Sequence, residues 1–223
     1  MTRTKLSDRI LPTYTKGEEF INTASHVTGA LFGIFALISC IALSAAKNDP
    51  WGITGCSIYG ASLIILYTAS SLYHGISHEM TKKVMQIIDH CTIYFLIAGT
   101  YTPILFCSIL PVSQVWAWII FALEWGFAII ATILTAIDIK KYFKFSMVCY
   151  IGMGWCILMA AKTAIEAIPF AGLMYLLFGG IAYTVGAVMY GIGKKHRYVH
   201  SIFHIFVLLG TLLQFICIRF YVI

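Results

Sequence analysis

The chain has 223 residues, of which 60% are hydrophobic and 11% are charged, and its mean hydropathy is +0.88. Soluble domains are about 45–50% apolar and about 25% charged, so this composition excludes an ordinary soluble domain and predicts a membrane protein. A transmembrane helix takes about 20 apolar residues, which leaves no room for a large soluble domain. The net charge of +6 would suggest nucleic acid in a soluble protein, but here we expect membrane lipids and no nucleic acid as partners.

Seven apolar segments follow one another along the chain and predict an all-α membrane protein, a seven-transmembrane helix bundle. We expect a polar tail over residues 1–19 and a single transmembrane domain over residues 20–223. The first apolar stretch is too long for the core of a signal peptide and lacks a convincing cleavage site, so it should remain as a helix. The predicted spans cover residues 20–46, 52–74, 84–109, 114–137, 145–162, 168–192 and 199–222.

Basic residues are distributed unequally over the connections between these spans. Twelve of the 15 Lys and Arg residues fall in the N-terminal tail and in the connections after the second, fourth and sixth spans. Only Lys47, Lys162 and Arg219 fall on the opposite side. Positive charges in short loops stay in the cytoplasm, so the sequence predicts a multi-pass protein of the cell membrane with its N-terminus in the cytoplasm and its C-terminus outside.

Polar residues inside the spans are the most informative ones, because a charged side chain there costs at least about 2.5–3.5 kcal/mol. His74 ends the second span, Asp89 lies near the start of the third, and His200 and His204 lie four residues apart at the start of the seventh. With the predicted topology all four residues lie in one layer near the cytoplasmic side. Three imidazoles are a familiar ligand set for catalytic zinc, with a fourth position left for water. The pattern therefore favours a Zn²⁺ site formed by His74, His200 and His204.

Two further residues are predicted to act in catalysis at this site. Asp89 would offset the charge of the cation, either by accepting a hydrogen bond from a bound water or as a direct ligand. Ser70 lies one turn before His74 on the same helix face. Its hydroxyl would bond the water, Asp89 or a substrate carbonyl, and bonding back to its own helix is the structural alternative.

Each of these residues also has a purely structural interpretation. A pair of histidines four residues apart also occurs where the rings only satisfy polar neighbours, and Asp89 alone would suit a proton relay or helix pairing. We expect His26 to face the cluster without binding the metal, and His90, on a different face from Asp89, to be a packed residue. Glu124, midway along the fourth span, should lie apart from the cluster as an interhelical pair or an independent polar patch.

Six segments spread over nearly the whole chain follow a known family pattern. They are Glu18-Glu19 with Asn22 and Ser25-His26; Ser70-Ser71-Leu72-Tyr73-His74; Asp89-His90 leading to Ala98-Gly99-Thr100-Tyr101-Thr102-Pro103; Met153-Gly154-Trp155; Gly179-Gly180-Ile181-Ala182-Tyr183-Thr184; and His200-Ser201-Ile202-Phe203-His204 with Gly210. With these segments the chain resembles the hemolysin III family, within the wider progestin and adipoQ receptor superfamily.

The resemblance implies a zinc ion held by His74, His200 and His204, with Asp89 linked to it through water. It also places Ser70 in the serine of the family's serine-x3-histidine motif. This joint pattern, in the right order on a seven-span chain, is specific.

The chain departs from the family pattern at two positions. Ser25 stands where Thr is usual, which is a mild change. Gln214 stands where many relatives carry another histidine, which removes a titrating group but none of the predicted ligands.

Three functional hypotheses follow from the residues and the resemblance. The first is a zinc-dependent hydrolase of lipid amide or ester bonds that influences membrane lipid composition, because relatives in the superfamily imply ceramidase-like activity. The second is a zinc-stabilised lipid sensor or receptor-like regulator without catalysis. The third is a cytolytic pore-forming hemolysin, which is disfavoured because the few intramembrane charges cluster at one depth and do not line a path.

Overall fold

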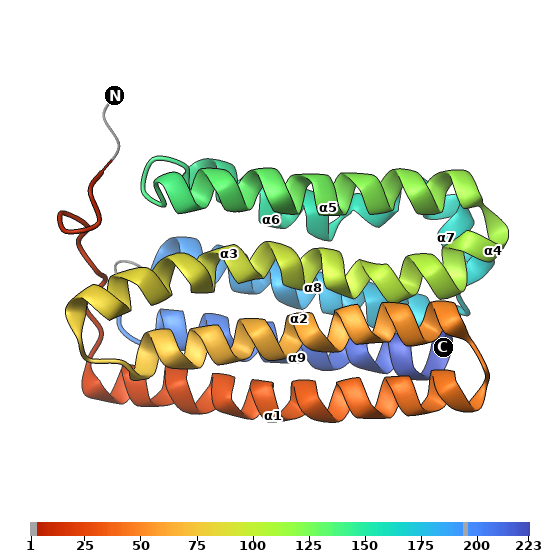
Figure 1. The fold of residues 1–223 in the computed structure, drawn as a ribbon, viewed down its shortest axis with the longest axis horizontal. Coiled ribbons are helices and arrows are strands. Elements are labelled where there is room, and N and C mark those ends of the chain that lie inside the picture. Colours follow the sequence, from red (N-terminus) through yellow and green to blue (C-terminus); the bar gives the residue numbers. More distant parts are fainter. Residues whose placement is uncertain (1–3, 194–195) are drawn as a thin grey trace.

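The protein folds as a bundle of long helices, which the computed structural model describes over residues 4–193 and 196–223. Within these ranges the chain forms helices and no strand, and seven helical segments are long and apolar enough to cross a membrane. The helices run side by side along the long dimension of the molecule (Figure 1). The predicted seven-span bundle is thereby confirmed.

Four of the seven spans are single α-helices, and three contain irregular turns. The elements are α1 (Lys16–Ala46); α2 (Pro50–Gly75); α3 (Glu79–Ile104) with the π-helix η1 (Leu105–Ile109) and α4 (Leu110–Val112); α5 (Gln114–Ile137); α6 (Phe143–Gly154) with the 3₁₀-helix η2 (Cys156–Ala160) and α7 (Ala161–Ala167); α8 (Phe170–Gly193); and α9 (Val199–Cys217) with the π-helix η3 (Ile218–Val222).

Chain order and packing order are largely the same. α1 packs along α2, α2 along α3, α3 along α5, and α9 packs against both α8 and α1. The segment before α1, the α2–α3 connection and the start of α9 gather at one end of the bundle, on the left in Figure 1. We call this the histidine end. The α1–α2 connection, α4, α7 and the C-terminus lie at the opposite end.

The first helix begins at Lys16, four residues before the first predicted apolar segment. Thr15 is the N-cap and forms a capping box with Glu18. The Thr15 hydroxyl accepts a hydrogen bond from the backbone N–H of Glu18, and the Glu18 carboxylate accepts one from the backbone N–H of Thr15. Because this pair satisfies N–H groups that a helix start leaves free, α1 extends far enough to include Glu18 and Glu19.

The fifth span is broken, although the sequence predicted one continuous helix over residues 145–162 followed by a connection over 163–167. α6 ends at Gly154, η2 follows, and the expected connection lies within α7. The hydroxyl of Tyr101 donates a hydrogen bond to the carbonyl of Gly154 at 3.0 Å and accepts one from the N–H of Ile157 at 3.1 Å. This tertiary contact satisfies backbone groups at the break, as irregular backbone at membrane depth requires.

Candidate metal centre

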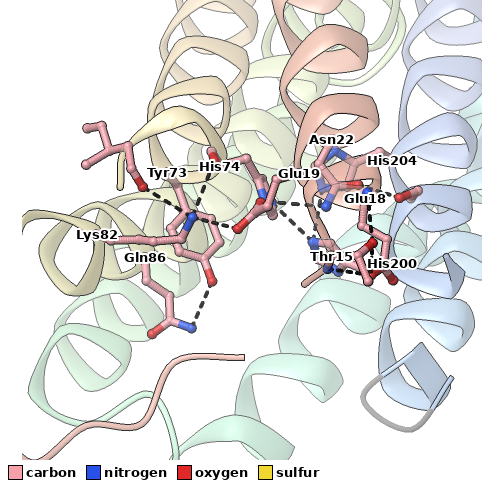
Figure 2. Close-up of polar contacts among 12 residues, drawn as sticks. Thr15, Glu18, Glu19, Asn22, Tyr73, His74, Lys82, Gln86, His200 and His204 are labelled. Atoms are coloured by element: carbon pink, nitrogen blue, oxygen red, sulfur yellow. Dashed lines mark hydrogen bonds and ion pairs between the residues drawn. The ribbon is translucent and has the colours of Figure 1, made fainter. Parts of the chain in front are cut away.

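Three imidazole rings meet at the histidine end of the bundle. His74 comes from the last turn of α2, and His200 and His204 come from the first turns of α9 (Figure 2). Nε2 of His200 lies 3.3 Å from Nε2 of His74 and 3.1 Å from Nε2 of His204. All three side chains are buried, and one nitrogen from each lies within 4.8 Å of the other two. The structure thus brings together the three predicted ligands in a cluster that can bind a metal ion.

The outward-facing nitrogens of this cluster have their own partners on α1. Nδ1 of His74 lies 2.6 Å from Oε2 of Glu19, and Oε1 of the same carboxylate accepts a hydrogen bond from Nζ of Lys82 at 2.6 Å. Nδ1 of His204 lies 3.4 Å from Oγ of Ser25. Since a carboxylate only accepts, Nδ1 of His74 carries a proton, and in the neutral ring this leaves the lone pair on Nε2.

This tautomer decides whether the cluster fits a metal. Ser25 donates its own proton to the carbonyl of Asn22 at 3.0 Å, so its oxygen is left to accept from Nδ1 of His204. The Nε2 lone pairs of His74 and His204 then both point toward Nε2 of His200. Nitrogen lone pairs at such separations repel unless a proton or a cation lies between them. The donor set therefore fits zinc, which binds neutral imidazoles whose other nitrogen donates to a carboxylate or an oxygen.

Tyr14 covers the cluster from outside the bundle. Its ring stacks on His200 with centroids 4.9 Å apart and planes 24° apart, and its centroid lies 5.5 Å from that of His74. Burial raises the pKa of Tyr14 well above its ordinary value, and the negative charges of neighbouring acidic groups raise it further. The phenol therefore stays neutral and adds an apolar cover to the site.

The N-terminal segment, residues 4–15, is held across the histidine end by hydrogen bonds to the C-terminal end of α5 and to α3. Its contacts are Thr4 N to Asp138 Oδ2 at 3.1 Å, Arg9 NH2 to the carbonyl of Ile137 at 3.1 Å, and Lys83 Nζ to the carbonyl of Ser7 at 2.8 Å. Burial alone would raise the pKa of Asp138, but the hydrogen bonds from Thr4 and from two backbone N–H groups lower it to about 2. The charged form of Asp138 thus anchors this segment.

A cavity of about 520 Å³ extends from the cluster into the bundle. Ser70, Asp89, His26 and His200 line its histidine end, so the predicted catalytic pair Ser70 and Asp89 faces the same space as one of the predicted ligands. Asp89 does not belong to the group of ligand atoms within 4.8 Å of one another. Its role through a water, and the role of Ser70, remain predictions.

Three other polar residues can now be placed. His26 faces the cluster, because its ring stacks on His204 with centroids 3.7 Å apart. His90 does not lie on a separate face from Asp89 as expected: its Nδ1 is 3.7 Å from Oδ2 of Asp89, and both residues line the cavity. Glu124 is buried away from the cluster, but no basic side chain of the described chain pairs with it.

Most of the cavity wall is apolar and comes from α3, α8, α9 and the broken fifth span. On α3 the lining runs from Asp89 to Ile104, about 22 Å at 1.5 Å per residue. Leu158, Ile165 and Phe170 also line it and are exposed on the outer surface of the bundle. The cavity therefore opens between the fifth span and α8, on the surface that would face lipid.

Two residues that the sequence analysis did not single out act at the cluster. Glu19 was given no role of its own at the site, and Tyr14 was not mentioned at all. The motif Thr15-x-x-Glu18 is a readable capping-box signal that would have placed Glu19 on α1, one turn before Asn22. The sequence carries no comparable signal for Tyr14, because its position depends on how the N-terminal segment folds back.

The comparisons with known proteins agree with this architecture. The family described as Haemolysin-III related matches residues 14–215. The chain is 36% identical over 208 residues to the Hemolysin-3 homolog of Bacillus subtilis (strain 168), covering 93% of this chain and 96% of that protein. It is 38% identical over 205 residues to Hemolysin-3 of Bacillus cereus, covering 92% of each. A human relative, Monocyte to macrophage differentiation factor, is 26% identical over 194 residues, covering 83% of this chain and 78% of that protein. The chain therefore belongs to the Haemolysin-III related family.

Proposed function

We propose that this Haemolysin-III related membrane protein is a zinc-dependent hydrolase of lipid amide or ester bonds. The observation that carries the proposal is a cluster of three buried imidazoles, one of which, His200, lines an apolar cavity that opens toward lipid. His74, His200 and His204 would hold the ion. When bound, zinc supplies Lewis acidity that lowers the pKa of water to about 7 and polarises a carbonyl group.

The side chains around the cluster have separate tasks in this proposal. Asp89 accepts the proton of the attacking water on its carboxylate, as a general base. Ser70 donates a hydrogen bond to the carbonyl oxygen of the substrate, where negative charge develops. Glu19 fixes the tautomer and orientation of His74, and Tyr14 keeps bulk water away from the outer face of the site.

The cavity indicates the class of substrate. Its wall is almost entirely apolar over a length that suits a long acyl chain, and polar side chains gather where the chain would meet the histidines. An opening between the fifth span and α8 would let a lipid enter from the membrane without crossing water. A scissile amide or ester bond at the head of an acyl chain fits both features.

The test measures release of fatty acid from defined lipids. The purified protein is loaded with one zinc ion per chain and given a long-chain N-acylsphingosine or an acyl ester in mixed micelles. We expect release of fatty acid by the wild type and a loss of at least about 100-fold in His200→Ala and in Asp89→Ala. The control is Lys162→Ala, a side chain that is 92% exposed. A zinc-loaded wild type that releases no fatty acid from any member of a broad lipid library would contradict the proposal.

A second candidate function is a zinc-stabilised lipid sensor without catalysis. It is supported by the contacts of the cluster with three helices. His74 on α2 contacts His200 on α9, and it also contacts Glu19 on α1. A structural ion at such a junction would stabilise the arrangement of three spans. In that case Asp89→Ala would keep both zinc and function, whereas His204→Ala would lose both. A cytolytic pore has less support, because the cavity wall is apolar and does not form a polar path.

A further inference from the structure

Two side chains that line the cavity have buried polar atoms without hydrogen-bond partners in the described part of the chain. They are His26, at both ring nitrogens, and Gln214, at Oε1. His26 is 3% exposed and Gln214 is 5% exposed, so water at the protein surface does not satisfy them. Leaving a buried polar group unsatisfied costs about 1–3 kcal/mol, so such groups call for an explanation.

Several other polar groups along the same wall are satisfied within the protein. The hydroxyl of Tyr183 lies 2.8 Å from Oγ1 of Thr211, and Nε1 of Trp155 donates to Oγ1 of Thr184 at 3.0 Å. Gln214 itself is half satisfied, because its Nε2 donates to the carbonyl of Leu176 at 3.1 Å. That bond fixes the amide, and the oxygen left over can only accept a hydrogen bond.

The two unsatisfied points lie far apart along the cavity. His26 stacks on His204, at the metal end, with ring centroids 3.7 Å apart. Gln214 lies ten residues after His204 on the same helix, which at 1.5 Å per residue is about 15 Å along the bundle. Between them the wall is formed largely by apolar residues such as Leu66, Ala187 and Val207.

We propose that Gln214 is a specificity-determining residue that recognises a hydroxyl group within the chain of the bound lipid. The polar head of that lipid meets His26 beside the histidine cluster, the chain fills the apolar part of the cavity, and a hydroxyl about 15 Å from the head donates its proton to Oε1 of Gln214. The preferred ligand class is therefore a chain-hydroxylated fatty acyl lipid. The proposal rests on the proposed function only for placing the lipid head at the metal end.

The test compares binding of two fatty acids, which are not cleaved and so report binding without hydrolysis. The probes are 12-hydroxyoctadecanoic acid, whose hydroxyl lies at about the required distance from the carboxyl group, and octadecanoic acid. Each displaces a fluorescent fatty acid from the zinc-loaded full-length protein in detergent. The ratio of the two Kd values in the wild type is compared with the same ratio in Gln214→Leu. Each fatty acid partitions into the micelles to the same extent with either protein, so this partition cancels in the comparison. We expect Gln214→Leu to reduce the preference for the hydroxy acid by about three- to tenfold, as one hydrogen bond implies.

Two controls separate recognition from general damage. His26→Phe keeps a ring that can stack on His204 but lacks both ring nitrogens. It should weaken the binding of both fatty acids by the same factor and leave the ratio of their Kd values unchanged. 2-Hydroxyoctadecanoic acid carries its hydroxyl beside the carboxyl group. The ratio of its Kd to that of octadecanoic acid should therefore be the same in Gln214→Leu as in the wild type. Gln214→Met is a second apolar variant, and the zinc content of each variant shows that it is folded.

The outcomes are distinct for the two proposals. A ratio that is the same in wild type, Gln214→Leu and Gln214→Met overturns the role of Gln214. A shift in ratio in both variants, in a protein that releases no fatty acid, supports the role of Gln214 while the proposed hydrolase fails.

Discussion

Oε2 of Glu19 lies 2.6 Å from Nδ1 of His74, so an acidic residue of the first helix orients an imidazole of the second that belongs to the histidine cluster. The other oxygen of this carboxylate is paired with Lys82 on α3 at 2.6 Å. The chain Lys82–Glu19–His74 thus joins three spans at the histidine end. It fixes both the ring plane and the tautomer that leave Nε2 of His74 free to bind a cation.

Replacing Glu19 should weaken metal binding without removing a ligand. We expect Glu19→Ala to lower the affinity for zinc by roughly 10–100-fold, as loss of a carboxylate behind a histidine ligand does elsewhere. The measurement is competition for zinc with a chromophoric chelator. The matched control is Glu79→Ala, which removes an exposed carboxylate paired with Lys83 on α3. Equal zinc affinity in wild type and Glu19→Ala would show that the contact does not support the site.

Removing the cover of the cluster should speed up metal exchange. Tyr14 stacks on His200, so we expect Tyr14→Ala to release zinc to excess EDTA several-fold faster than the wild type does. Tyr14→Phe keeps the ring and should behave as the wild type, since stacking and not the hydroxyl provides the cover. Stopped-flow detection of the released metal measures the rate. A rate unaffected by Tyr14→Ala would mean that the metal leaves by another route.

The attachment of the N-terminal segment should depend on pH through Asp138. Its folded pKa of about 2 lies below the value of about 3.9 for a free Asp. A lowered pKa means that the charged group stabilises the folded contact above about pH 4 and that this stabilisation is lost as the pH falls toward 2. Pepsin cleavage near Leu11 should therefore be slow at pH 4 and accelerate toward pH 2. Cleavage of a free peptide of residues 1–20 at each pH corrects for the pH dependence of pepsin itself.

A variant tests the same anchor at neutral pH. Asp138→Asn removes the charge that accepts the hydrogen bond from Thr4. Trypsin should then cut after Arg9 faster than in the wild type at pH 8, while Glu166→Gln, a half-exposed acid at the opposite end, should have no effect. Unchanged cleavage in Asp138→Asn would show that Asp138 does not hold the segment.

The number and approximate limits of the spans could be predicted from hydropathy alone, because lipid imposes long apolar helices. The meeting of His74 with the pair His200 and His204 was also predictable, since topology places the three helix ends in one layer. The start of α1 was readable as well, from the capping box Thr15-x-x-Glu18. A local pattern thus determines the spans and the start of α1, and the alternating direction of the spans brings the three histidines to one end.

Other features depend on contacts between distant segments and carry no local signal. The break in the fifth span is satisfied by Tyr101, 53 residues before Gly154 in the chain, so its own composition gave no reason to expect it. The stacking of Tyr14 on His200 likewise requires the N-terminal segment to fold across the bundle. Such long-range hydrogen bonds and ring contacts are set by tertiary packing and not by hydropathy or helix propensity.

The direction of insertion is a further prediction from the sequence. The twelve basic residues in the N-terminal tail and in the connections after the second, fourth and sixth spans predict that the histidine end lies in the cytoplasm and that the C-terminus lies outside. Alkaline phosphatase fused after Ile223 in a bacterial host should therefore be active, and a fluorescent protein fused there should stay dark. The reverse pattern would place the histidine cluster on the outer side of the membrane.

The most direct test of the account is the metal content of the purified full-length protein, measured by mass spectrometry with His200→Ala and the surface variant Lys162→Ala beside it. His200 contributes the nitrogen that lies 3.3 and 3.1 Å from those of its two partners. The account predicts one zinc ion per chain in the wild type and in Lys162→Ala, and almost none in His200→Ala. A wild type that binds no zinc, or a His200→Ala variant that binds as much as the wild type, would contradict it.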